Sequence, residues 1–103
     1  MIGNFVKNER VRLKLTQEEL AEKAKMKATY LSKLERDQLP TPPSEEVLIS
    51  LAYALQADPH EIIVKAGRVP SDFRDLILED ENVFKYLKRK VAEHNRKEDS
   101  NAI

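Results

Sequence analysis

One stretch decides the fold of this chain, and it covers residues 15–36: LTQEELAEKAKMKATYLSKLER. Thr16 is a favourable helix N-cap residue, and Glu19, three positions later, completes the spacing of a capping box. The apolar residues that follow recur at the three- and four-residue spacing of a helix face. The stretch therefore predicts two short helices, over 17–24 and 28–36, separated by a three-residue break.

The rest of the chain is also predicted to be helical. No segment alternates in the two-residue period of a strand, and no Asn-Gly or Asp-Gly hairpin turn occurs. Prolines and N-cap residues mark the element boundaries, as they do in helical proteins. We expect an all-α chain whose other helices cover about 2–14, 45–56, 59–66, a short segment from Pro70, and about 80–96.

The composition excludes several classes of protein. The chain has 103 residues, 18 Lys and Arg, 18 Asp and Glu, and no cysteine, which rules out disulfides, zinc–thiolate sites and cysteine nucleophiles. No apolar run approaches the ~18 residues of a membrane span, and no signal peptide layout begins the sequence. We therefore expect a cytoplasmic protein that does not contact membranes.

The sequence also lacks the patterns of an enzyme. His60 and His94 are far apart, there are only two glycines, and no nucleophile–base arrangement or metal-ligand spacing occurs. We expect no enzymatic activity, no metal and no cofactor. Positive charge is instead concentrated at the N-terminal end, where residues 1–43 carry nine Lys and Arg against six Asp and Glu. Such an excess is compatible with a nucleic-acid partner.

The segments 15–24 and 30–36 resemble the second and third helices of the Xre/Cro/cI-type repressor family, and later residues resemble its fourth and fifth helices. The resemblance covers residues 2–66. It implies a five-helix lambda-repressor-like domain over 1–68, containing a helix-turn-helix whose second helix enters the DNA major groove. It further implies a homodimer that binds double-stranded DNA at a palindromic site.

The resemblance assigns roles to individual residues. Base reading is implied for Lys27, Ala28, Thr29, Ser32 and Lys33, whose side chains can donate to base edges or contact a thymine methyl group. Phosphate contacts are implied for Gln17, Arg36, Gln38 and Arg12. A structural ion pair between the first and third helices is implied for Arg10 and Glu35. The alternative for the lysines is that they are solvated surface charges.

Two positions depart from the family pattern. Lys25 occupies a turn position where glycine is usual, so we expect it at positive φ, at a cost of about 1 kcal/mol. Glu9 replaces a residue that is commonly apolar, so the first helix is expected to lie less deeply against its neighbours. Neither change touches the positions that would read bases.

The C-terminal region is predicted to be a helical extension over 69–97, followed by a disordered tail over 98–103. The extension is more apolar than folding alone requires, and we expect part of it to form the dimer interface. Its apolar stripe comprises Phe73, Leu76, Ile77, Phe84, Leu87 and Val91. The alternative is that these helices fold back and close the monomer core.

Two functions remain open at this level. The first is a sequence-specific transcriptional repressor, with an antirepressor protein as a possible further partner. The second is a protein-interaction module, of antitoxin or antirepressor type, that uses the same helices without reading DNA. The outward positions of the helix over 28–36 favour DNA, since they carry lysine, threonine and serine rather than acidic or apolar residues.

Overall fold

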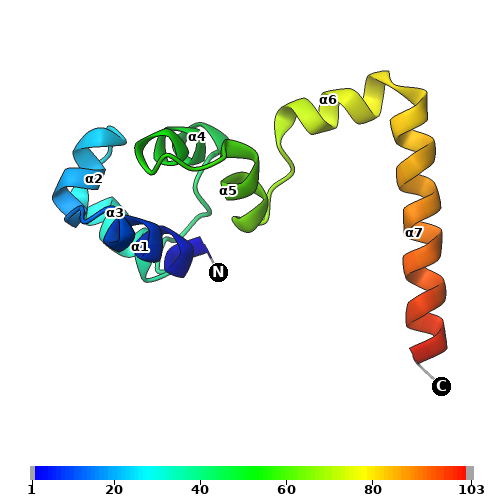
Figure 1. Cartoon of the computed structure of the whole chain (residues 1–103), viewed down its shortest axis with the longest axis horizontal. Coiled ribbons are helices and arrows are strands. Elements are labelled where there is room, and N and C mark those ends of the chain that lie inside the picture. The colour runs from blue at the N-terminus through cyan, green and yellow to red at the C-terminus, as the bar shows by residue number, and fades with distance from the viewer. Residues whose placement is uncertain (1, 102–103) are drawn as a thin grey trace. The chain divides into compact units, whose positions relative to one another are not determined.

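The computed structural model describes residues 2–101, and the side chains of residues 2–98. Within that part of the chain the structure contains helices and no strand, so the all-α prediction is confirmed (Figure 1). The helices are α1 (Ile2–Arg12), α2 (Gln17–Lys23), α3 (Ala28–Glu35), α4 (Glu45–Ala54), α5 (Pro59–Lys65), α6 (Ser71–Glu79) and α7 (Glu81–Asn101). No helix among the described residues combines the length and hydrophobicity of a membrane crossing.

Helices α2, α4 and α5 each follow an N-cap residue whose side chain accepts a hydrogen bond from a free backbone N–H of the first turn. Thr16 Oγ1 accepts a hydrogen bond from the Glu19 N–H at 3.0 Å, and the Glu19 carboxylate accepts one from the Thr16 N–H at 2.9 Å. Ser44 caps α4 by accepting a hydrogen bond from the Val47 N–H, and Asp58 caps α5 by accepting one from the His60 N–H. These caps are local, which is why their positions could be predicted from sequence.

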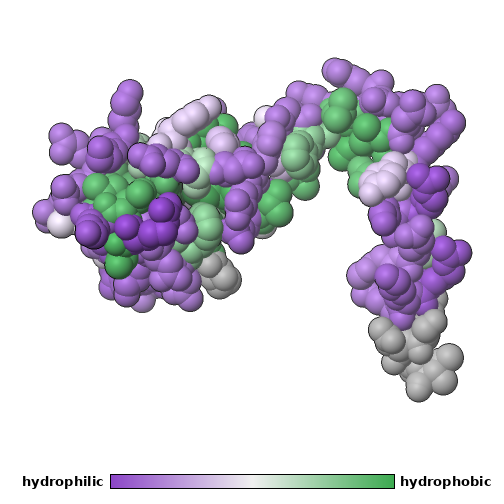
Figure 2. Space-filling view, in the orientation of Figure 1, coloured by the Kyte–Doolittle hydropathy of each residue, from purple (hydrophilic) through white to green (hydrophobic). Residues whose placement is uncertain are grey.

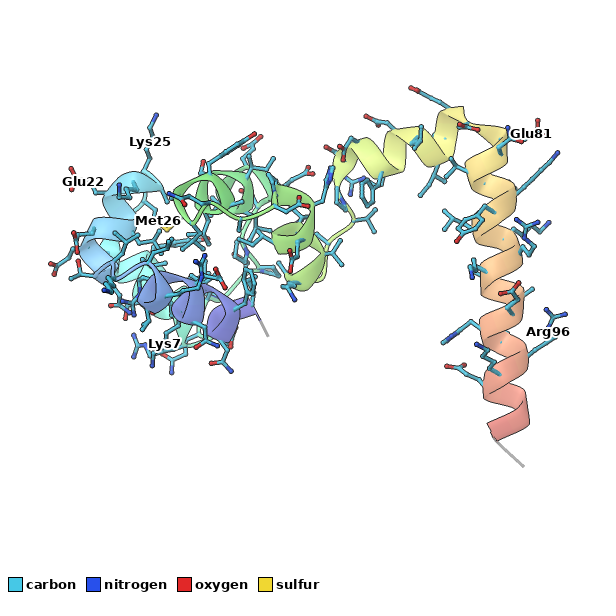
Figure 3. All side chains as sticks on the ribbon, viewed as in Figure 1. Lys7, Glu22, Lys25, Met26, Glu81 and Arg96 are labelled. Atoms are coloured by element: carbon cyan, nitrogen blue, oxygen red, sulfur yellow. The ribbon has the colours of Figure 1, made fainter. Side chains whose placement is uncertain are left out.

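The first four connections after helices use residues in the left-handed region. Lys14, Lys25, Asp37 and Gln56 have φ between 55° and 58°, and none of them is glycine. The expectation for Lys25 is therefore confirmed, and its side chain projects outward from the turn between α2 and α3 (Figure 3). Gly67, with φ 83°, follows α5 in the same way. Because a left-handed residue cannot continue a helix, the first five helices end one or two residues before their predicted ends.

The first compact unit, residues 1–70, buries its own hydrophobic core. Apart from Pro70, the largest fully buried side chains come from α1 to α5 or their caps and include Val6, Leu20, Leu31, Leu34, Leu48, Leu51, Leu55 and Ile62. Polar side chains cover most of the visible surface of this unit (Figure 2). Glu9 is only partly exposed and pairs with Arg12, yet Val6 is fully buried, so the unusual acidic residue does not prevent α1 from packing.

The second compact unit, residues 71–103, consists of α6 and α7. Helix α7 continues to Asn101, whereas the sequence predicted an end near Arg96 and a disordered tail from residue 98. The helix continues because no glycine or proline follows Pro70, and because an ion pair between His94 and Glu98 spans the predicted end. Residues 102–103 lie outside the described part of the chain.

Removing the capping box should lower stability measurably. We expect Thr16→Ala to reduce the free energy of unfolding by about 1 kcal/mol, because the Glu19 N–H loses its acceptor. Hydrogen bonds from Thr16 hold the pKa of Glu19 below its usual value, so this carboxylate stabilises the fold above its unfolded pKa and less so as pH falls. Alanine keeps the backbone N–H that is the main cause of the lowered pKa, so the difference between wild type and variant in urea unfolding should shrink only slightly on acidification, and a difference that grew would contradict this account.

Candidate nucleic-acid interface

Helix α3 presents one face to the core and the opposite face to solvent. Leu31, Leu34 and Glu35 are buried, which fixes the rotation of the helix about its axis. Thr29 and Lys33, one helical turn apart, consequently lie on the exposed side. This face has the width of one helix and carries no acidic side chain, so it can enter a major groove.

The structure places all five predicted base-reading residues in or next to this face. Lys27 is exposed at the N-cap of α3, where its side chain makes no capping bond. Ala28 and Ser32 are partly buried at the edges of the face, beside the exposed Thr29 and Lys33. The three exposed side chains form no ion pair with any described residue, so their donors remain available to a partner.

A buried carboxylate fixes α3 against the two preceding helices. The Glu35 side chain is 2% exposed, and it accepts hydrogen bonds from Arg10 Nε at 2.7 Å and Nη2 at 3.0 Å. Arg10 Nη1 also donates to the Leu15 carbonyl at 2.8 Å. The structure thus brings the predicted pair together in bidentate geometry, which ties the recognition angle of α3 to α1 and to the turn before α2.

The predicted phosphate contacts are in different environments. Gln17 is partly buried, and its Nε2 donates to Glu35 Oε1 at 3.0 Å, so this side chain already has a partner inside the protein. Arg36 and Gln38 are exposed just after α3. Arg12 is exposed but forms an ion pair with Glu9 at 2.7 Å, which offsets part of its charge.

Sequence reasoning missed a second link between α1 and α3. The Gly3 N–H donates to Asp37 Oδ1 at 3.1 Å, so a carboxylate 34 residues away caps the start of α1. Gly3 is buried, and a Cβ there would lie 2.5 Å from the Glu35 carbonyl oxygen. The one available signal was that Gly3 is one of only two glycines, in a segment otherwise predicted to be helical.

A shallow hollow follows the exposed face of α3. It is lined by Thr29, Lys33 and Tyr30 together with residues 39–41 of the loop before α4. Burial raises the pKa of the Tyr30 hydroxyl, so this group stays a neutral donor and acceptor at physiological pH. The hollow therefore places apolar surface from Leu39 and Pro40 beside the polar side chains of Thr29 and Lys33.

Comparisons with known proteins agree with this geometry. Residues 6–62 match the model of a helix-turn-helix family, HTH_3. The crystal structure of SinR, described as the master regulator for biofilm formation, in complex with DNA is 34% identical over 60% of this chain and 97% of that chain, with a TM-score of 0.56.

Two further structures match over more of the chain. The complex of SinR with SinI is 27% identical and covers 97% of this chain and 99% of that chain, with a TM-score of 0.57. The clp gene regulator ClgR from Corynebacterium glutamicum is 27% identical and covers 86% and 88%, with a TM-score of 0.54. No curated protein sequence gives a significant match.

Proposed function

This chain belongs to the helix-turn-helix family of DNA-binding transcriptional regulators, and we propose that it is a dimeric repressor reading a palindromic operator with α3. The observation that carries the proposal is the exposed face of Thr29 and Lys33, held in place by the buried Arg10–Glu35 pair. The similarity to SinR, whose structure contains DNA, supports the same reading. The regulator family also accounts for the lack of catalytic residue patterns in the sequence.

Each base-reading residue has a chemical role in this proposal. Lys27 and Lys33 donate to guanine O6 and N7, and Thr29 donates, accepts or meets a thymine methyl group. Ser32 donates or accepts at the edge of the face, and Ala28 offers only apolar contact. Arg36, Gln38 and Arg12 contact phosphates, and Gln17 does so through the side-chain atoms that its bond to Glu35 leaves available.

The dimer in this proposal is held by the second unit. Phe73, Leu76, Phe84, Leu87 and Val91 are between 38% and 57% exposed, although all are large and apolar, and Ile77 is partly buried beside them. Figure 2 shows hydrophobic surface on α6 and at the start of α7. A second copy would cover this stripe and present two α3 helices to half-sites ~34 Å apart.

Selection of bound sequences from random duplex DNA tests the proposal. We expect enrichment of a palindrome, and binding that falls with salt with a log–log slope of about −5 if some six phosphates are contacted. An absence of any enriched sequence, with purified and folded protein, would refute DNA reading.

Lys33 offers a sharper test of base reading. We expect Lys33→Ala to weaken binding to the selected operator by about 1–3 kcal/mol and to relax discrimination at one base-pair position. Affinity measured against a set of single-base operator variants would show this as a flattened profile at that position. An equal loss over all sequences would instead assign Lys33 to a phosphate.

A fragment tests the role of the second unit. Residues 1–70 bury their own core, so we expect this fragment to fold and to sediment as a monomer at concentrations where the full chain is a dimer. Its affinity for the full palindrome should drop steeply, while its affinity for a half-site should be retained. Dimerisation equal to that of the full chain would place the interface within the first unit.

A protein partner is the second candidate function, and one observation favours it. The matched SinR structure that covers 97% of this chain is a complex with another protein, SinI. The apolar stripe of α6 and α7 would suit an antirepressor that competes with the second copy. The lysines on α3 discriminate the two candidate functions. If the chain only binds a protein partner, its affinity for that partner should not fall with added salt or with Lys33→Ala.

A further inference from the structure

Helix α7 contains the most basic segment of the chain. Residues 82–97 carry six Lys and Arg against one acidic residue, Glu93, which gives a net charge of +5. No other stretch of this length reaches that value. The residues just before it have the opposite sign, since 72–81 carry five Asp and Glu against one Arg. The chain as a whole has zero net charge, yet its second unit includes a strongly cationic helix.

These cations gather on the side of α7 away from its apolar stripe. Phe84, Leu87 and Val91 repeat at spacings of three and four, which places them on one side of the helix. Two further rows, each at spacings of four and seven residues, lie about 110° and 150° round the axis from the stripe. We call these exposed rows the basic face, which comprises Lys85, Tyr86, Arg89, Lys90, Arg96 and Lys97. A second copy that covered the stripe would leave the basic face open to solvent.

The cations of the basic face have weak acidic partners or none among the described side chains. Arg96 forms no ion pair with any of them, and Figure 3 shows it projecting away from the helix. Lys85 pairs with Glu81 at 3.3 Å and Lys90 with Glu93 at 3.7 Å, but all four side chains are at least 43% exposed. Exposed pairs within one helix contribute little free energy, so a polyanion can displace these carboxylates.

Tyr86 lies within the basic face and is approached by two of its cations. The Arg89 guanidinium carbon and Lys90 Nζ each lie 5.8 Å from the centre of the Tyr86 ring, within the range of cation–π contacts. Tyrosine, arginine and lysine side chains all donate to phosphate oxygens. The basic face has no other large apolar side chain, whereas a protein interface has an apolar or aromatic core. Its chemistry therefore suits a nucleic-acid backbone better than a protein surface.

We propose that the basic face of α7 binds the phosphate backbone of duplex DNA outside the two half-sites. The face runs from Lys85 to Lys97, about 18 Å along the helix, which matches about five phosphates of one strand at ~3.4 Å per base pair. The inference rests on the DNA binding of the proposed function and extends it to the second unit. The contact adds affinity for every flanking sequence alike, because phosphates carry no base identity.

The length of the duplex tests this contact in the full chain. One duplex ends with the two half-sites, and the other adds ~20 base pairs, about two helical turns, on each side. We expect wild type to bind the longer duplex at least about fivefold more tightly at about 100 mM salt. Arg89→Gln/Lys97→Gln should lose most of this advantage. Its log–log salt slope on the longer duplex should be smaller by about 3.6, since each dimer loses four cations.

Arg74→Gln/Lys88→Gln is the matched control for charge. Both residues are exposed and belong to the second unit, but neither lies in the basic face. This control removes the same charge, and glutamine is a good helix former in all four positions. We expect it to keep the advantage of the longer duplex to within about twofold. A loss that depended on net charge alone would affect both double variants equally and would overturn the proposal.

Three further outcomes separate the alternatives. If Arg89→Gln/Lys97→Gln keeps the wild-type advantage for the longer duplex, the basic face does not bind DNA, and the proposed function stands. If sedimentation shows that this variant alone loses dimerisation, the face pairs with residues 72–81 of a second copy, and the DNA contact is overturned. If wild type selects no operator, the proposed function fails. The basic face is then tested on random-sequence duplex, where the variant should show a smaller salt slope than the control, and equal slopes would refute the contact.

Discussion

Replacing Arg10 by methionine should remove about 3–5 kcal/mol of stability, the cost of leaving a buried charge without its partner. Methionine keeps the length of the aliphatic stem but supplies none of the three hydrogen bonds that Arg10 makes. The Glu35 carboxylate, 2% exposed, would retain only Gln17 Nε2 as a donor. The total free energy of unfolding of a unit of some 70 residues is only about 4–10 kcal/mol, so the variant should begin to unfold at a much lower temperature than wild type.

The same substitution should weaken operator binding, because Arg10 fixes the angle of α3 without lying on its exposed face. At temperatures where part of the Arg10→Met protein is unfolded, we expect it to lose more operator affinity than Lys33→Ala does. At lower temperatures, where Arg10→Met is folded, some loss of affinity should persist because α3 is less well positioned. Adding Glu35→Gln to Arg10→Met should recover much of the stability, since no buried charge then remains.

Arg12→Met is the stability control for this experiment. Arg12 is also an arginine of α1 paired with a glutamate, but its side chain is 60% exposed, so its replacement should change stability by less than about 0.5 kcal/mol. If Arg10→Met instead leaves both the melting temperature and the operator affinity unchanged, the pair does not hold α3 in place.

The contrast between these two arginines shows what sequence could reveal. Helix starts at Thr16, Ser44 and Asp58 were predictable because the cap and the capped N–H are two or three residues apart. The rotation of α3 was predictable too, because Leu31 and Leu34 share one face of a 3.6-residue period. The Arg10–Glu35 pair required the family resemblance, since nothing local links residues 25 positions apart.

Long-range geometry set the limit of prediction. The bond from Gln17 to Glu35 and the bond from Gly3 to Asp37 depend on how α1, α2 and α3 pack, which no periodicity encodes. The predicted ends of α1 and α4 lie beyond the observed ones. Lys14 and Gln56 adopt a backbone conformation that favours glycine, so the residue types gave no signal that the helices stop there. The predicted end of α7 lies before the observed one, because a polar segment without apolar periodicity can still be helical when its charges pair.

Replacing Gly3 by alanine should be the most damaging single-methyl change in the first unit. The added Cβ would lie 2.5 Å from the Glu35 carbonyl oxygen and 2.8 Å from that of Leu34. Both are backbone atoms at the end of α3, so no side chain can rotate away, and α1 or α3 must move. We expect a loss at or above the upper end of the 1–3 kcal/mol typical of overpacking, measured by urea unfolding.

The direction of the Gly3→Ala effect is informative because helix propensity alone predicts the opposite sign. At an unconstrained helix position, glycine to alanine adds about 0.5–1 kcal/mol of stability. Asn8→Ala, at an exposed position of the same helix, should show this mild benefit and serves as the control. Because the displaced atoms belong to the residues just before Arg36, Gly3→Ala should also weaken operator binding in the fraction that remains folded. A stabilised Gly3→Ala protein would show that α1 does not approach α3 this closely in solution.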